Sequence, residues 1–74
     1  MNIKRDKFLT LANNRVNRAI KDVRLIGNLS NRSAYEFSEE DVRKIFRVLH
    51  RELEIARSRF SDNGGRSDSD FRLK

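Results

Sequence analysis

The sequence has no cysteine, one histidine and only three glycines, and it contains no long apolar run. Without cysteine the chain cannot form disulfides or a cysteine-based metal site, which fits a reducing compartment. Gly64 and Gly65 do not lie between a strand and a helix, so no phosphate-cradling loop is expected. No stretch approaches the roughly 20 apolar residues that span a bilayer, and no run of signal-peptide length follows Met1. We therefore expect a cytoplasmic protein without membrane contact.

Side chains that could carry out chemistry are few and poorly grouped. His50 has no second metal ligand and no nucleophile near it in the pattern, which is more typical of a helix surface than of a catalytic base. Glu52 and Glu54 are two residues apart, so on a helix they diverge and cannot share a substrate. The sequence therefore predicts a protein that is not an enzyme, with no catalytic residue, no metal site and no cofactor.

The chain is short and basic. Its 74 residues make one small helical domain, residues 1–60, followed by a tail at 61–74 whose low apolar content predicts disorder. The core of so small a domain is marginal, so a partner or self-association is expected. The net charge of +6 indicates attraction to an acidic partner, which nucleic acid or an acidic protein surface would equally satisfy.

Break signals are concentrated in residues 27–38, GNLSNRSAYEFS, which separate two amphipathic segments. Gly27 and Asn28 tolerate the left-handed conformation that ends many helices, so they predict a C-cap. Ser38, with an acidic turn after it, predicts the N-cap of a second helix. The predicted fold class is therefore all-α: a two-helix antiparallel hairpin with a structured connector.

The first helix is predicted at about residues 4–26. We expect its apolar face to be core; that face comprises Phe8, Ala12, Val16, Ala19, Ile20, Val23 and Ile26. This segment has seven basic residues against two acidic ones, so five of the six net charges lie in it. The opposite face carries a basic stripe that includes two leucines: Lys7, Leu11, Asn14, Arg18, Lys21 and Leu25.

The stripe has two interpretations. It is either a solvated face, although such faces normally mix both signs of charge, or a mixed apolar and basic contact surface. If the stripe is a solvated face, Leu11 and Leu25 are expected to be covered by a second protomer or by the connector. The candidate partner-binding residues are Lys7, Leu11, Arg15, Arg18, Lys21, Arg24 and Leu25, with Asn31 and Arg32 of the connector.

The second helix is predicted at about residues 39–60, with Phe37 and Val42 placed as a hydrophobic staple around its N-cap. Its apolar residues recur at alternating spacings of four and three, and this heptad-type seam is Val42, Phe46, Leu49, Leu53, Ala56 and Phe60. A second stripe interleaves basic and branched apolar residues: Lys44, Val48, Arg51, Ile55 and Arg59. One hairpin cannot bury this much surface. We therefore expect a homodimeric four-helix bundle to cover part of it and a foreign partner the rest.

The connector also has two interpretations. In one, Leu29, Tyr35 and Phe37 pack over the end of the hairpin. In the other, the loop displays Asn31, Arg32 and Tyr35 for recognition. The first is favoured, because ordered apolar residues in a short connection usually serve packing.

A sequence-reading DNA-binding motif is not supported, because the connector is longer than the turn of a helix-turn-helix and no third helix is predicted. Non-specific phosphate binding by the basic first helix stays open as an alternative function, and it would weaken steeply with salt. The remaining alternative is a purely structural dimerisation module.

Residues 24–33, RLIGNLSNRS, followed by Tyr35 and by Glu40, Asp41 and Val42, resemble the signature of small helical proteins from bacteria and their phages. Size, basicity and a helical hairpin also resemble the phage-encoded regulator that binds bacterial RNA polymerase. The resemblance implies a non-enzymatic regulator, located in the host cytoplasm if phage-encoded, that inhibits transcription initiation and permits antitermination. It supplies no active-site motif, so it assigns no residue roles.

Overall fold

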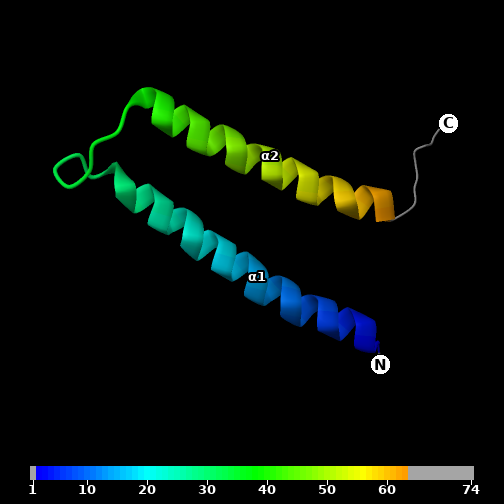
Figure 1. Cartoon of the computed structure of the whole chain (residues 1–74). Helices are drawn as coiled ribbons and strands as arrows, with labels where there is room; N and C mark the ends of the chain where they lie inside the picture. The colour runs from blue at the N-terminus through cyan, green and yellow to red at the C-terminus, as the bar shows by residue number, and fades with distance from the viewer. Residues whose placement is uncertain (1, 64–74) are drawn as a thin grey trace. The chain divides into compact units, whose positions relative to one another are not determined.

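The computed structural model describes residues 2–63, and within them the chain is helical without any strand. Two α-helices, α1 (Ile3–Gly27) and α2 (Glu39–Asn63), are joined by a 3-10 helix, η1 (Asn28–Ser30), and an irregular segment (Figure 1). The all-α prediction is confirmed. The chain divides into two units, Met1–Glu36 and Phe37–Lys74. The assignment of residues 1–60 to one helical domain stays a prediction.

The first helix begins at an asparagine cap. Asn2 has extended backbone angles, and its side-chain oxygen accepts a hydrogen bond from the Arg5 N–H at 3.0 Å. Its carbonyl accepts from the Asp6 N–H, also at 3.0 Å. Asp6 places a negative charge in the first turn, at the positive end of the helix dipole. The side chain of Asn2 thereby satisfies one of the donors left unpaired at a helix start, and the bond to its carbonyl is the first ordinary bond of the helix. Helix α1 begins one residue before the predicted start.

The end of α1 differs from the prediction of a left-handed C-cap. Gly27 has φ −60° and ψ −31°, and Asn28 has φ −65° and ψ −17°, so both residues are right-handed. The Asn28 N–H still donates to the carbonyl of Arg24, as in a continuing helix. The prediction was wrong because the backbone tightens into the η1 turn, which keeps negative φ angles, and does not reverse at the glycine.

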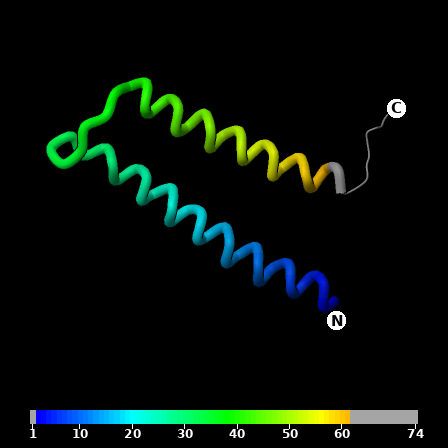
Figure 2. The backbone as a smooth tube through the Cα atoms, viewed as in Figure 1, coloured from blue at the N-terminus to red at the C-terminus, as the bar shows by residue number. Residues whose placement is uncertain are grey.

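Asn31 organises the connector after η1. Its side-chain oxygen accepts from the Ser33 N–H at 3.1 Å and from the Ser33 hydroxyl at 2.6 Å, and its carbonyl accepts from Ala34 and Tyr35. This is an Asx-type turn, in which a short polar side chain replaces backbone hydrogen bonds. Figure 2 shows the backbone curling into a small loop there. Leu29 and Tyr35 are about half exposed, at 47% and 50%.

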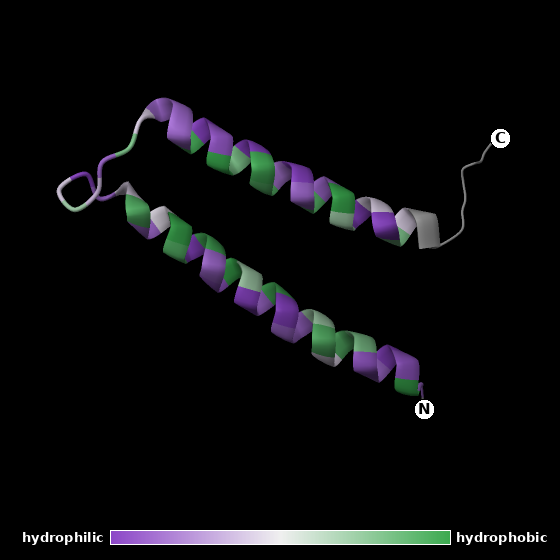
Figure 3. Cartoon of the chain, viewed as in Figure 1, coloured by the Kyte–Doolittle hydropathy of each residue, from purple (hydrophilic) through white to green (hydrophobic). Residues whose placement is uncertain are grey.

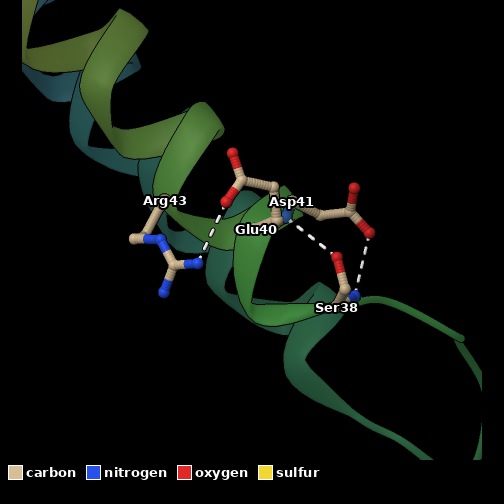
Figure 4. A network of polar contacts seen from close by, with 4 residues as sticks. All are labelled: Ser38, Glu40, Asp41 and Arg43. Carbon is tan, nitrogen blue, oxygen red and sulfur yellow. Dashed lines mark hydrogen bonds and ion pairs between the residues drawn. The ribbon is translucent and has the colours of Figure 1, made fainter.

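The second helix starts at the predicted serine cap. The Ser38 hydroxyl accepts from the Asp41 N–H at 3.1 Å, and the Asp41 carboxylate accepts from the Ser38 N–H at 2.8 Å (Figure 4). This reciprocal pair is a capping box with aspartate in the place usually taken by glutamate. In the same turn Glu40 pairs with Arg43 at 3.0 Å. The Ser38 N–H, more than the Ser38 hydroxyl and the Lys44 charge, lowers the pKa of Asp41.

Helix α2 runs to Asn63, three residues beyond the predicted end at Phe60. Residues 61–63, which were assigned to the tail, are therefore helical. The rest of the predicted disordered tail lies outside the described residues.

The described side chains form no buried core. Among residues 2–61 none is buried, and the half-buried ones are Ala12, Ile26, Phe37, Val42 and Leu49. Two of these, Phe37 and Val42, are the predicted staple residues. The face of α1 predicted to be core is mostly exposed, with Phe8 at 48% and Val16 at 56%, and only Ala12 and Ile26 of that face are half-buried. A single helix covers little of its own apolar face, because burial needs a second layer. Figure 3 shows that hydrophobic and hydrophilic residues alternate along both helices.

Candidate partner-binding surface

The basic stripe is formed by one uninterrupted helix. Because α1 runs from Ile3 to Gly27, spacings of four and three place successive stripe residues one above the other. The stripe comprises Lys7, Leu11, Asn14, Arg18, Lys21 and Leu25. At 3.6 residues per turn, these residues lie within about 40° of a common line that is about 27 Å long. The structure therefore brings five of the nine predicted site residues together.

The other four predicted residues lie elsewhere. Arg15 and Arg24 are on α1 but about 80° and about 100° away from the line of the stripe, on opposite sides of it. Asn31 and Arg32 follow η1 in the connector. A flat partner surface centred on the stripe would thus meet Arg15 and Arg24 only at its edges.

The charge of the stripe is uncompensated within the described chain. Lys7, Arg18 and Lys21 form no ion pair among residues 2–63, and neither do Arg15 and Arg24. In α2, two basic side chains pair with acidic ones one turn away: Arg43 with Glu40 at 3.0 Å and Arg57 with Glu54 at 3.5 Å. The α1 surface therefore presents net positive charge to the solvent, where it can attract an acidic partner.

Two leucines interrupt the basic side chains. Leu11 is 37% exposed and Leu25 is 57% exposed, and both lie on the line of the stripe. Fourteen residues of helix separate them, which is about 21 Å. Protein interfaces combine apolar and polar contacts, and the stripe supplies side chains of both kinds. The stripe therefore offers two apolar contact points and three positive charges on one face.

Asn31 has a structural role in the loop. Its side-chain oxygen already accepts two hydrogen bonds from Ser33, so that oxygen holds the turn. Its contribution to partner binding, like that of Arg32, stays a prediction.

The sequence pattern gave Arg5 no role beyond its positive charge. In the structure its guanidinium carbon lies 5.8 Å from the centre of the Phe8 ring, a cation–π distance. By helical angle Arg5 lies about 160° from the line of the stripe, on the apolar face of α1. The spacing of three between Arg5 and Phe8 is the signal that could have identified this contact.

The described residues include no group of three or more His, Asp or Glu side chains placed to hold a metal ion. No helix among them is both long enough and apolar enough to cross a membrane.

Comparison with protein-family models, with curated proteins and with solved structures found no match to this chain. The resemblance carried by residues 24–33 therefore stays a prediction.

Proposed function

We propose that this protein is a non-enzymatic regulator that acts by binding another protein through the basic stripe of α1. Bacterial RNA polymerase is the leading target, with inhibition of initiation and antitermination as the outcome. The observation that carries the proposal is the combination on one helix face of uncompensated positive charge with two exposed leucines, Leu11 and Leu25. The resemblance in size, basicity and predicted helical hairpin to the phage-encoded regulator supports the choice of target.

The leucines favour a protein partner over nucleic acid. A phosphate backbone pairs with Lys and Arg but gives an apolar side chain nothing to pack against. Fully burying an exposed leucine contributes about 1.5–3 kcal/mol, of which Leu11 and Leu25, at 37% and 57% exposed, would gain the share that is still exposed. Binding to nucleic acid through α1 is the alternative function, and it would leave Leu11 and Leu25 exposed.

The antiparallel arrangement of the two helices and their association into a four-helix bundle stay predictions from the sequence, as does the cytoplasmic location.

The test is fluorescence anisotropy of the full chain, labelled at its N-terminus and titrated with RNA polymerase core free of nucleic acid. Arg18→Glu and Lys21→Glu should each weaken binding about tenfold, because an attraction becomes a repulsion at a contact partly shielded from water. Leu25→Ala should weaken it by a similar factor through lost apolar contact.

The matched control is Arg5→Glu. It changes the net charge by the same amount on the same helix but lies on the opposite face, so it should leave the affinity within about twofold. Absence of saturable binding would contradict the choice of polymerase. Equal weakening by Arg5→Glu and Arg18→Glu, together with tight binding to DNA or RNA that falls steeply with salt, would replace the proposal with the nucleic-acid alternative.

A further inference from the structure

The apolar seam of α2 is a second surface that the proposed function does not use. Its six residues, Val42, Phe46, Leu49, Leu53, Ala56 and Phe60, lie within one continuous helix. A heptad seam stabilises its helix only when another helix covers it. In this structure Leu53 is 65% exposed and Phe60 is 69% exposed. The seam lies on α2 and the basic stripe lies on α1, so a role for the seam does not rest on the proposed function.

The heptad register is set by the spacing. With Phe46, Leu53 and Phe60 at the a positions, Val42, Leu49 and Ala56 fall at d. Every a and d position between 42 and 60 is then apolar, with no polar residue interrupting the seam. The flanking g positions hold Ile45, Glu52 and Arg59, and the flanking e positions hold Arg43, His50 and Arg57.

These flanks are complementary in a parallel, in-register pair of α2 helices. In that arrangement a g residue faces the e residue five positions later on the other chain. Glu52 of one chain then faces Arg57 of the other, and symmetry makes this contact twice. Ile45 faces His50, which adds no repulsion. All the flanking contacts between residues 43 and 57 are therefore attractive or neutral.

The same flanks are repulsive in an antiparallel pair. There, g residues face g residues and e residues face e residues. With the seam aligned end to end, Glu52 meets Glu52 at the centre, and Arg43 meets Arg57 on both sides. Three like-charge contacts replace the two attractive ones.

The side chains that would form the parallel contacts are available. Glu52 makes no ion pair within residues 2–63. Arg57 pairs with Glu54 of its own helix at 3.5 Å, and their side chains are 80% and 73% exposed. An exposed pair of this kind contributes little, so Arg57 can turn to Glu52 of another chain at small cost.

We propose that the occupant of the α2 seam is the α2 helix of a second copy of this chain, paired in parallel and in register as a two-stranded coiled coil. The seam is about 27 Å long, which is under three heptads. Association through so short a seam is reversible and depends on protein concentration. The pair would place two α1 helices, and hence two basic stripes, on one particle.

Cross-linking of single-cysteine variants tests the direction, because the natural chain has no cysteine. In the parallel pair Val42→Cys lies opposite its own copy and should form a disulfide-linked dimer on mild oxidation, as should Phe60→Cys. A mixture of the Val42→Cys and Phe60→Cys chains should give only disulfides between identical positions, 42 with 42 and 60 with 60. Ser58→Cys, on the opposite face of α2, is the control and should stay unlinked. A dominant mixed product joining positions 42 and 60 would overturn the parallel arrangement.

Sedimentation equilibrium of the full chain gives an independent readout. Arg57→Glu should raise the dimer dissociation constant about tenfold, because it places Glu52 opposite a carboxylate twice. In an antiparallel pair the same substitution would tighten the dimer, since Arg43 would then face a carboxylate. Arg47→Glu makes the same change of charge away from the seam and should have less than about twofold effect.

A wild-type chain that stays monomeric at every concentration would overturn the inference. The seam would then be covered by another part of the same chain or by a foreign protein. Tightening of the dimer by Arg57→Glu would overturn it in favour of the antiparallel pair. None of these outcomes alters polymerase binding through Arg18 and Lys21, so this proposal and the proposed function fail separately.

Discussion

Substitution of Ser38 by alanine should destabilise α2 specifically. The Ser38 hydroxyl accepts from the Asp41 N–H at 3.1 Å, and Ser38→Ala removes that acceptor from the capping box. Loss of a serine cap costs about 1 kcal/mol, which is a factor of roughly five in the helix–coil equilibrium. Because no described side chain of α2 is buried up to Ser61, little packing energy is available to mask this loss. Far-ultraviolet circular dichroism during urea titration of the full chain would measure it.

Ser58→Ala is the matched control, because it makes the same substitution within the same helix. The Ser58 hydroxyl donates to the Glu54 carbonyl at 2.9 Å, a mid-helix contact that slightly weakens helices. Alanine is also the better helix former by about 0.5 kcal/mol, so helicity should rise a little. If both alanine variants changed helicity in the same direction by similar amounts, the capping account of α2 would be refuted.

Two further predictions concern the helix ends. The Ser38 N–H lowers the pKa of Asp41 below its ordinary value of 3.8, so the stabilisation is complete above that value and is lost as the pH falls through the lower pKa of the folded chain. Asp41→Asn should therefore reduce the loss of helicity on acid titration, and an unchanged acid titration would contradict the assignment. Gly27→Ala should stabilise α1 by about 0.5–1 kcal/mol in thermal melts, because Gly27 is right-handed and a Cβ there meets nothing within 4 Å. A left-handed Gly27 would give the opposite sign.

The sequence predicted local structure well wherever the signal was itself local. Ser38 with an acidic first turn marked the start of α2 correctly, because a cap depends on residues within one turn. Asn2 could have been recognised in the same way, since a capping residue directly precedes Ile3 and Asp6 lies in the first turn. The signal that was missed is the short polar side chain of Asn2, which is next to Met1.

Gly27 shows where local composition was insufficient. Glycine permits a left-handed C-cap but does not require one, and the choice depends on the structure of the next few residues. Here the η1 turn and the Asx-type turn at Asn31 hold those residues with their own hydrogen bonds, so the backbone has no need to reverse at Gly27. Residue types alone did not show that the two turns would occur in succession.

The faces of the helices were predictable, but their burial was not. Periodicity places Lys7, Arg18 and Lys21 on one side of α1 as soon as the segment is helical, and the helix is confirmed. The same periodicity led to the prediction that Phe8 and Val16 are core, whereas both are exposed. Burial depends on what packs against a face, which the spacing within a single helix does not contain.

The most direct test of the central claim, that the basic stripe of α1 binds a protein, is the affinity of the Arg18→Glu chain for RNA polymerase core relative to that of the Arg5→Glu chain. The account predicts saturable binding in both cases, about tenfold weaker for Arg18→Glu. Equal affinities of the two variants, or no saturable binding by the unaltered chain, would contradict it.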